Sequence, residues 1–423
     1  MSLIERDSQY LWHPYTQHKT AATPIAIVKG AGALLWDENN KEYIDAIASW
    51  WVNPFGHSNR FIADALYKQL TTLEHVLFGG FTHEPAILVA EKLMKILPDN
   101  QKKIFFSDNG STSVELAIKV ALQYFFNKGE KRTTIIAFED AFHGDTFAAM
   151  AASGISFYTQ AFQGMFIDVV RIPVPVKGRE QESYDALNKA IANNNCAGFI
   201  FEPLVQGAAG MVMYAPEALD QLMTICKNHQ VLTIADEVMT GFGKTGKTFA
   251  CDYLQTQPDM MCLSKALTGG TIPMAITTFT QELFDGFYSD DINKALFHGH
   301  TFTANPTGCA AALASIDLLQ SQEMQDNIAR VHQSHLAFQK SIESHPKVTT
   351  TRVLGVIFAL EIKTESQESY YGTLRNKLYN FFIENGVVLR PVGNIVYILP
   401  PYIITPQQLQ KVYEVVEKAL EIA

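Results

Sequence analysis

Two charged side chains in this chain follow directly after apolar, strand-like runs. Residues 231–237 read VLTIADE and place Asp236 at the end of a strand, and residues 259–267 read DMMCLSKAL and place Lys265 in the same way. Ligands bind at the carboxyl ends of strands in parallel sheets. A buried ammonium group costs free energy unless it is paired, neutral or covalently used. A Schiff base would meet these conditions together, and pyridoxal phosphate (PLP) is the aldehyde cofactor that uses a lysine in this way.

If Lys265 binds PLP, Asp236 has a role beside the cofactor. A desolvated lysine has a lowered pKa, which supplies the free amine that attacks an aldehyde. A carboxylate that faces the pyridine nitrogen of PLP keeps this nitrogen protonated, and the protonated ring withdraws electrons from a substrate carbanion. The alternative is that Asp236 caps a turn while Lys265 reaches solvent. Either is ordinary alone, but the two residues together favour a cofactor site.

A phosphate site should accompany these two residues. Residues 103–126 read as a strand (KIFF), a polar turn (SDNGST) and an apolar-faced helix. Gly110, Ser111 and Thr112 would present N–H groups and hydroxyls at the positive end of this helix. Polar turns before helices are commonly just N-caps. This segment therefore supports a phosphate site only in combination with Asp236 and Lys265.

A further segment, 142–146, reads FHGDT and follows the next strand. It places Phe142 and His143 where a loop could cover a flat heterocycle. Packing of Phe142 in the core is the alternative.

The elements that must position these residues form an α/β pattern. From about residue 60 to residue 310, β-branched runs alternate with longer helix-like stretches, which predicts a mostly parallel sheet with helices on both faces. An amphipathic stretch from Cys309 to about Ile342 follows. We then expect strands near 353–362 and 395–399 and helices around 370–384 and 406–421.

This pattern divides the chain into three parts. We expect residues 1–59 to contribute to a small domain and to the substrate channel, residues 60–310 to form a large PLP-binding domain, and residues 311–423 to complete the small α+β domain. Since no linker is recognisable, the boundary near residue 310 should be a continuous helix.

Composition excludes several classes of function. The net charge of −10 over 423 residues disfavours nucleic acid and anionic membranes as partners. Neither a signal peptide nor a membrane span is recognisable, so we expect a cytoplasmic protein. The five cysteines are odd in number and form no Cys-x-x-Cys pair, so we expect buried, reduced thiols and no metal site.

Six segments resemble, in order and spacing, the fold-type I, class III (omega) aminotransferases, and the resemblance covers essentially the whole chain. They are NGSTSVELAIK (109–119), FHGDT (142–146), EPLVQGAAGM (202–211), ADEVMTGFGKTG (235–246), LSKALTGG (263–270) and HGHTFTANPTGCAAAL (298–313).

The resemblance implies roles for individual residues. Lys265 would carry PLP, Asp236 would pair with the ring nitrogen, and Val238 and Phe142 would pack on opposite ring faces. Gly110, Ser111 and Thr112 would hold the phosphate. Thr301 would reach the phosphate of a neighbouring subunit, which implies a homodimer with shared sites and an inactive monomer. Gly299, in the same loop, would lie at the substrate site.

Three more segments are similar to the members of this family that act in biotin biosynthesis. They are WHPYT (12–16), ASWWVNPFGH (48–57) and RPVGNIVYILPPYII (390–404). This similarity implies 8-amino-7-oxononanoate as amino acceptor and S-adenosylmethionine as amino donor.

The chemistry of this acceptor agrees with these residues. A keto-amine on a long methylene chain that ends in a carboxylate needs an apolar channel with one fixed cation, and Arg390 can bind a carboxylate through two charge-assisted bonds. Trp50, Trp51, Tyr15 and Tyr397 would line the channel. Adjacent tryptophans on a strand point to opposite faces, so we expect only one of the pair to contact substrate. The alternatives are core packing for the aromatic residues and a surface salt bridge for Arg390.

Four positions depart from patterns seen in relatives. Glutamate-using relatives carry a glutamate where this chain has Ala208, so Arg390 lacks an acid to control it, which argues against glutamate as donor. Phe142 replaces a tyrosine, so one hydroxyl near the cofactor is missing. We expect the Tyr15 hydroxyl to supply polar contacts there instead. Lys244 and His300 replace an arginine and a proline, which leaves lysine open as an alternative donor.

The expected reaction is ping-pong: a donor amine displaces Lys265, the freed lysine moves a proton between the α-carbon and C4′, and the acceptor then takes the nitrogen by the reverse path. The alternatives are a class III aminotransferase for another ω-amino acid or diamine, a PLP aminomutase, and a PLP-binding protein without activity.

Overall fold

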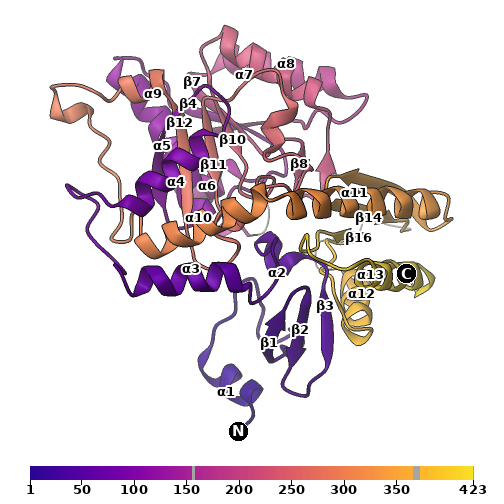
Figure 1. Cartoon of the computed structure of the whole chain (residues 1–423). Helices are drawn as coiled ribbons and strands as arrows, with labels where there is room; N and C mark the ends of the chain where they lie inside the picture. Colours follow the sequence, from indigo (N-terminus) through magenta and orange to yellow (C-terminus); the bar gives the residue numbers. More distant parts are fainter. Residues whose placement is uncertain (155–157, 365–371, 423) are drawn as a thin grey trace.

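The computed structural model describes residues 1–154, 158–364 and 372–422. Its centre is a seven-stranded sheet in which only β12 runs antiparallel to its neighbours (Figure 1). In spatial order the strands are β4 (Gln101–Ser107), β12 (Ala275–Thr280), β11 (Met260–Leu263), β10 (Leu232–Asp236), β7 (Cys196–Phe201), β5 (Thr134–Phe138) and β6 (Val169–Ile172). The predicted mostly parallel α/β sheet is confirmed.

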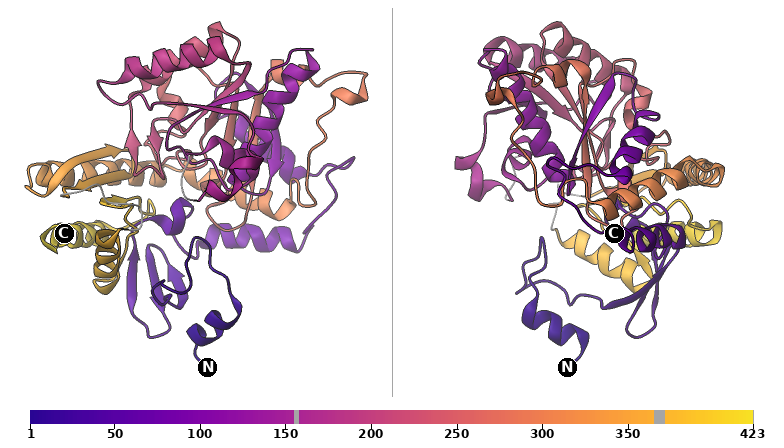
Figure 2. Two further views of the ribbon diagram at one scale, coloured as in Figure 1. Left: turned by 180° about the vertical axis from the view of Figure 1, so that it is seen from behind. Right: turned by 60° about the vertical axis from the view of Figure 1, so that its left-hand side comes forward.

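Helices cover both faces of this sheet, as the views in Figure 2 show. Alternate residues of a strand point to opposite faces. In β5, Ile135 and Ala137 pack in the cluster that contains α5 (Gly110–Asn127). Ile136 and Phe138 pack in the other cluster. That cluster also holds α7 (Glu180–Asn193), α8 (Pro216–Asn228) and α10 (Pro306–Gln320). This apolar burial on both sides explains the near-continuous hydrophobic strands of the sequence.

The parallel strands end at one edge of the sheet. Asp236 is the last residue of β10 and lies level with Cys262 of the neighbouring β11. Lys265 follows β11 by two residues, and Glu202 follows β7 directly. The parallel pairing therefore brings three titratable side chains from separate stretches of sequence to the same edge.

The two ends of the chain meet in smaller sheets. β1 (Ile27–Ala31), β2 (Leu34–Asp37) and β3 (Glu42–Asp45) are joined by β15 (Val387–Val388), which pairs in parallel with β3. A second sheet contains β13 (Val348–Leu354), β14 (Ile357–Ile362) and β16 (Ile395–Ile398). Figure 1 shows the indigo strands β1–β3 beside the yellow helices α12 (Thr373–Glu384) and α13 (Pro406–Ile422). On this pairing we propose that residues 1–59 and 311–423 form the smaller domain and residues 60–310 the larger one.

Several boundaries differ in detail from the sequence prediction. The amphipathic stretch 309–342 is two helices, α10 and α11 (Gln322–Ile342), because Ser321 ends one and caps the other. The strand predicted over 353–362 is the end of β13 and the whole of β14, joined through Gly355 at φ 58°. The start of the helix predicted over 370–384 falls partly outside the described residues.

The remaining elements are short or connect these sheets. They are the helices α1 (Leu3–Tyr10), α2 (Ala48–Trp51), α3 (Arg60–Leu70), α4 (Glu84–Met94), α6 (Phe147–Ala152) and α9 (Gln281–Asp285), the strands β8 (Val205–Gln206) and β9 (Val212–Met213), and the 3-10 helices η1 (Gln160–Met165), η2 (Ala250–Tyr253), η3 (Lys265–Thr268) and η4 (Ile292–Lys294).

All five cysteines are buried and free, as expected. Over the residues that the structure describes, no helix has both the length and the apolar character that crossing a bilayer requires. The same residues contain no cluster of three or more metal-ligating side chains.

Candidate active site

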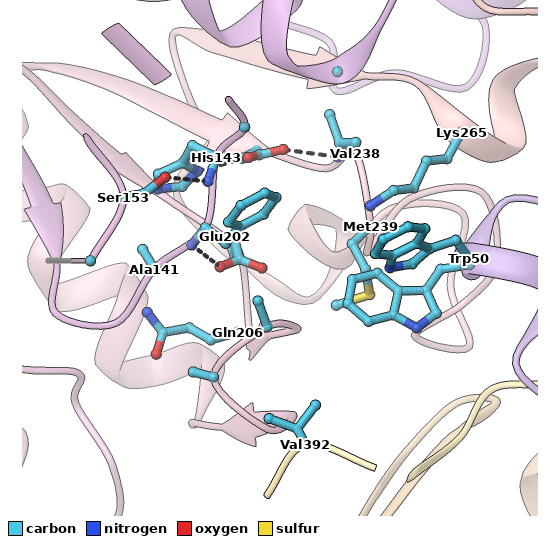
Figure 3. A pocket seen from close by; sticks show the side chains of 18 of the residues that line it. Trp50, Ala141, His143, Ser153, Glu202, Gln206, Val238, Met239, Lys265 and Val392 are labelled. Carbon is cyan, nitrogen blue, oxygen red and sulfur yellow. Dashed lines mark hydrogen bonds and ion pairs between the residues drawn. The ribbon is translucent and has the colours of Figure 1, made fainter. Parts of the chain in front are cut away.

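A cavity of about 1760 Å³ lies at the edge where the parallel strands end (Figure 3). It brings together most of the residues singled out in the sequence: Tyr15, Trp50, Trp51, Gly110, Ser111, Phe142, His143, Asp236, Val238, Lys265, Arg390 and Tyr397. Within the described part of the chain, Thr112, Gly299 and Thr301 do not line it.

Lys265 enters the cavity from the first position of η3. Its backbone is left-handed, with φ at 49°, a conformation that costs a non-glycine residue about 1–3 kcal/mol and is concentrated at functional sites. Burial lowers the pKa of the Lys265 ammonium, while the charges of Asp236 and Glu202 oppose this shift. The Nζ atom lies 4.8 Å from the centre of the Trp51 ring. The result is an enclosed amine that deprotonates more readily than a surface lysine.

Asp236 is held in a fixed orientation by two hydrogen bonds. One carboxylate oxygen accepts from the Val238 N–H at 3.1 Å, and the other lies 2.7 Å from Nδ1 of His143. His143 is itself positioned, since its N–H donates to the Ser153 hydroxyl at 2.9 Å. The Nε2 atom of His143 is buried without a partner in the described structure. His143 therefore orients Asp236, which the sequence did not predict.

Glu202 is a second carboxyl of the site that the sequence analysis did not identify. Only 4% of it is exposed, and it accepts from the N–H groups of Phe142 at 3.1 Å and Gly207 at 2.9 Å. Burial raises the pKa of Glu202 to about 7, and the charge of His143 opposes the rise. The signal that identified Asp236, an acid directly after an apolar strand, is also present at Glu202.

The start of α5 forms the end of the cavity near Ser111. Asn109 caps this helix by accepting from the Thr112 N–H at 3.0 Å. The N–H groups of Gly110 and Ser111 at the first two helical positions meet no acceptor in the described part of the chain. By contrast, the Thr112 hydroxyl donates to Asp108 and Asn109, within the cap itself. The helix end can hold an anion through backbone N–H groups.

The start of α5 packs closely against the side chain of Val238. A Cβ atom placed on Gly110 would lie 2.7 Å from Cγ1 of Val238, which is too close for any real contact. Glycine therefore lets the chain approach the side chain that, with Phe142, faces the cavity. Phe142 is 40% exposed, so the alternative of core packing does not hold.

The two tryptophans lie in a strained turn rather than on a strand. Ala48, Ser49 and Trp51 have φ values of 47°, 61° and 63°, so both indoles face the cavity and the strand argument for the pair is wrong. The buried carboxylate of Asp45 stabilises the turn. It accepts from the N–H groups of Ile47 at 3.2 Å and Ser49 at 2.7 Å.

Arg390 follows β15 and lies in the cavity wall. Its guanidinium carbon is 4.9 Å from the centre of the Trp50 ring. No ion pair joins Arg390 to an acid within the described residues, so the expected alternative of a surface salt bridge is absent from this part of the chain. Tyr397 of β16 packs edge-on against Trp51 at 5.9 Å.

Tyr15 connects the N-terminal segment to the loop after β5. Its hydroxyl donates to the carboxylate of Asp145, and its ring packs edge-on against Trp50 at 5.9 Å and Tyr158 at 5.7 Å. A chain segment far from the sheet in sequence thereby covers part of the cavity.

Comparison with known proteins agrees with this geometry. The family model described as aminotransferase class-III matches residues 15–420. The chain belongs to the class-III aminotransferases. It is 43% identical to the adenosylmethionine-8-amino-7-oxononanoate aminotransferase of Synechococcus elongatus, over 97% of this chain and 98% of that protein. The enzyme of the same name from Staphylococcus aureus is 34% identical, over 99% and 97%.

Solved structures of other aminotransferases have the same fold. The adenosylmethionine-8-amino-7-oxononanoate aminotransferase of Methanocaldococcus jannaschii superimposes with a TM-score of 0.93 at 32% identity, over 100% of this chain and 99% of that chain. The omega transaminase of Pseudomonas jessenii in complex with PMP gives 0.91 at 28% identity, over 100% and 98%.

As a class-III aminotransferase, the chain is a PLP-dependent enzyme. The cavity fits this cofactor. The enclosed amine of Lys265 could bond to an aldehyde, and the N–H groups at the start of α5 could hold a phosphate. Val238, which packs closely against Gly110, could face a flat ring in the cavity. The buried carboxylate of Asp236 lines the same cavity and could pair with a pyridine nitrogen.

Besides Phe142, the three other positions that depart from relatives lie in different parts of the structure. Lys244 is 1% exposed, does not line the cavity and donates to the Gly241 carbonyl at 3.2 Å. Burial, with the charge of Lys265, lowers the pKa of Lys244 to about 7. Ala208 lines the cavity and offers Arg390 no carboxylate. His300 accepts from the Phe302 N–H at 3.2 Å, so it shapes the loop that carries Thr301.

Proposed function

We propose that this class-III aminotransferase transfers the amino group of S-adenosylmethionine to 8-amino-7-oxononanoate, which gives 7,8-diaminononanoate for biotin biosynthesis. The support from relatives is their name, adenosylmethionine-8-amino-7-oxononanoate aminotransferase, at 33–43% identity. The support from geometry is Arg390, a cation without an acidic partner in the described chain that faces the same cavity as Lys265.

Arg390 is the observation that carries the proposal. The acceptor has a carboxylate at the far end of an apolar chain, and an arginine fork binds such a group through two parallel bonds. The indoles of Trp50 and Trp51 lie in the cavity between this anchor and the amine. Apolar walls bury the methylene chain, at about 0.8 kcal/mol per CH₂ group.

The remaining residues would prepare and move a proton. When bound, PLP would supply a carrier for the transferred amino group and a sink for negative charge on the substrate carbon. Asp236 would keep a proton on the ring nitrogen of the cofactor, and two hydrogen bonds orient its carboxylate for this role. Lys265 would act as the base that takes a proton from the donor carbon and passes it on, because its Nζ is the enclosed amine of the cavity. Tyr15 and Asp145 close the side of the cavity toward the N-terminal segment.

We also propose that the enzyme is a cytoplasmic homodimer with shared active sites. Thr301 and Gly299 are exposed and lie outside the cavity of their own subunit. They would then serve the phosphate and the substrate in the site of the partner subunit.

A half-reaction with a panel of donors tests the proposal. The purified PLP form is mixed with S-adenosylmethionine, lysine, glutamate or an ω-amino acid, and conversion of the cofactor to its amine form is followed by absorbance. We expect S-adenosylmethionine to convert the cofactor to its amine form. Addition of 8-amino-7-oxononanoate should then return the cofactor to its aldehyde form. Conversion by lysine alone would reassign the donor, and conversion by ω-amino acids alone would overturn the proposal.

A further inference from the structure

Two adjacent tryptophans each face one of the two cationic groups in the cavity. Trp51 presents its ring to Nζ of Lys265 at 4.8 Å, and Trp50 presents its ring to the guanidinium of Arg390 at 4.9 Å. Figure 3 shows Lys265 and Trp50 on one side of the cavity, across from His143 and Glu202. A single turn of chain therefore contacts both the reacting end and the anchoring end of the site.

The backbone of this turn is held rigidly. Its left-handed residues persist only where the surroundings enforce them. The enforcing group is Asp45, which is fully buried and accepts from the Ser49 N–H and, at 2.8 Å, bonds to Nε2 of His57. The backbone that carries the two indoles is thus held by contacts of the fold itself.

Arg390 depends on this turn because nothing acidic holds it in the described chain. Its position after β15 is free of ion pairs, and the neighbouring loop offers Ala208 rather than a carboxylate. A guanidinium on an indole face gains cation–π attraction and loses none of its N–H donors, which lie in the plane of the group. The ring can therefore hold Arg390 while its fork stays available to a carboxylate.

We propose that the Trp50–Trp51 turn sets the chain length of the carboxylate-ended substrate, with Trp50 as the residue that positions Arg390. The inference rests on the proposed function for the kind of acceptor, a chain with a terminal carboxylate. Trp51 determines where the amine of Lys265 stands and Trp50 determines where the guanidinium stands, so the separation of the two indoles determines how many methylenes fit between them.

Straight-chain monocarboxylates from butanoate to decanoate test this directly, because they bind without reacting. Their affinity for the holoenzyme is measured by isothermal titration calorimetry. In the native enzyme we expect affinity to rise about fourfold per methylene until the chain spans the gap, and then to stop rising. In Trp50→Leu we expect about tenfold weaker binding and no defined chain length at which the affinity stops rising. Trp50→Phe keeps an aromatic face, so it should retain most of the native affinity and the chain length at which the affinity stops rising.

Trp36→Leu is the matched control. Trp36 lies on β2, outside the cavity, and has a similar cation–π contact, with Lys29 at 4.6 Å. We expect this variant to keep the native chain-length profile. The inference is overturned if Trp50→Leu keeps the native profile, or if it and Trp36→Leu weaken binding to the same extent.

Tryptophan fluorescence gives a second measurement that does not need the leucine variant. A bound carboxylate pairs with the guanidinium that lies against the Trp50 ring. The charge next to this indole is then neutralised, so the native enzyme should change its tryptophan emission and Trp50→Phe should not. Equal changes in both proteins contradict the inference. Since these assays involve no transamination, a failed donor assay with an intact length profile rejects the proposed function and retains the role of the turn.

Discussion

Two lysines lie in or behind the wall of this cavity, one half-buried and one fully buried, and their surroundings distinguish their roles. Lys265 has Asp236 and Glu202 as charged neighbours and opens to the cavity, whereas Lys244 is enclosed and bonds to a backbone carbonyl. Burial lowers the pKa of both amines, so a lowered pKa alone does not identify a catalytic lysine. Access to the cavity is the property that distinguishes Lys265.

The first prediction concerns the charge of Asp236. In Asp236→Asn the amide still bonds within the loop but cannot hold a proton on the pyridine nitrogen, so we expect the single-turnover rate of the donor half-reaction to fall about a hundredfold or more. Asp259→Asn is the control, since Asp259 precedes β11 at the opposite edge of the sheet and accepts from the Thr233 N–H. A rate within twofold of the native value for Asp236→Asn would contradict the assigned role.

A second prediction concerns the room beside Val238. Gly110→Ala places a methyl group 2.7 Å from Cγ1 of Val238 and must displace that side chain, although alanine suits a helix better than glycine. We expect the dissociation constant of PLP, measured by fluorescence titration of the apoenzyme, to rise about tenfold without loss of thermal stability. Gly164→Ala, which meets only open space, should bind PLP normally. Unchanged PLP affinity in Gly110→Ala counts against the proposed ring position.

Among the elements, the sequence pattern predicted β4, β10 and β11 of the central sheet and the helix after Asn109, because a local apolar pattern specifies them. It placed Asp236 and Lys265 together because parallel strands end at one edge. The geometry of the Trp50–Trp51 turn could not be predicted, since its left-handed backbone is enforced by Asp45 and His57 rather than by local propensity. The side-chain bond between His143 and Asp236 likewise joins residues 93 positions apart.

From His335, which lies where α11 packs against β14 and α13, we predict a pH effect on the free energy of unfolding. His335 lies in this core, bonds to the Tyr413 hydroxyl at 2.7 Å and to the Val356 carbonyl at 3.1 Å, and burial lowers its pKa to about 3. A lowered folded-state pKa adds stability that is complete above the ordinary value of 6.5 and is lost as pH falls toward 3. Between pH 6.5 and pH 5 the native protein should therefore lose about 2 kcal/mol through this residue.

Comparison with His335→Gln isolates this contribution. Glutamine does not titrate, so its stability curve should lack the acid-side loss, as measured by urea unfolding across the pH range. The buried carboxyls of Glu202 and Glu237, with pKa values raised to about 7, act in the opposite direction in both proteins. Their stabilisation is complete below pH 4.5 and is lost as pH rises toward 7. Parallel curves for the two proteins would exclude His335 as the source.

At the scale of the whole molecule, the loop that carries Thr301 presents apolar side chains to solvent in the single chain. Phe297 is 72% exposed and Phe302 is 59% exposed. Exposed aromatic residues beside a polar phosphate-binding candidate fit a surface that a second copy covers. The proposed homodimer would bury them and bring Thr301 to the cavity of the partner subunit.

Mixed dimers test the shared site. Lys265→Ala and Thr301→Ala are each expected to have low activity alone. Subunits mixed after denaturation should regain about a quarter of native activity, because half of the dimers are mixed and each of these carries one intact site. If Thr301 acts within its own subunit, mixing restores nothing.

The most direct test of the account is to locate the lysine that carries the cofactor. The holoenzyme is reduced with borohydride, digested, and mapped by mass spectrometry for the peptide that retains the reduced cofactor. The account predicts the label on Lys265 and none on Lys244, although burial lowers the pKa of both amines. A label on Lys244, or native transamination rates in Lys265→Ala, would contradict it.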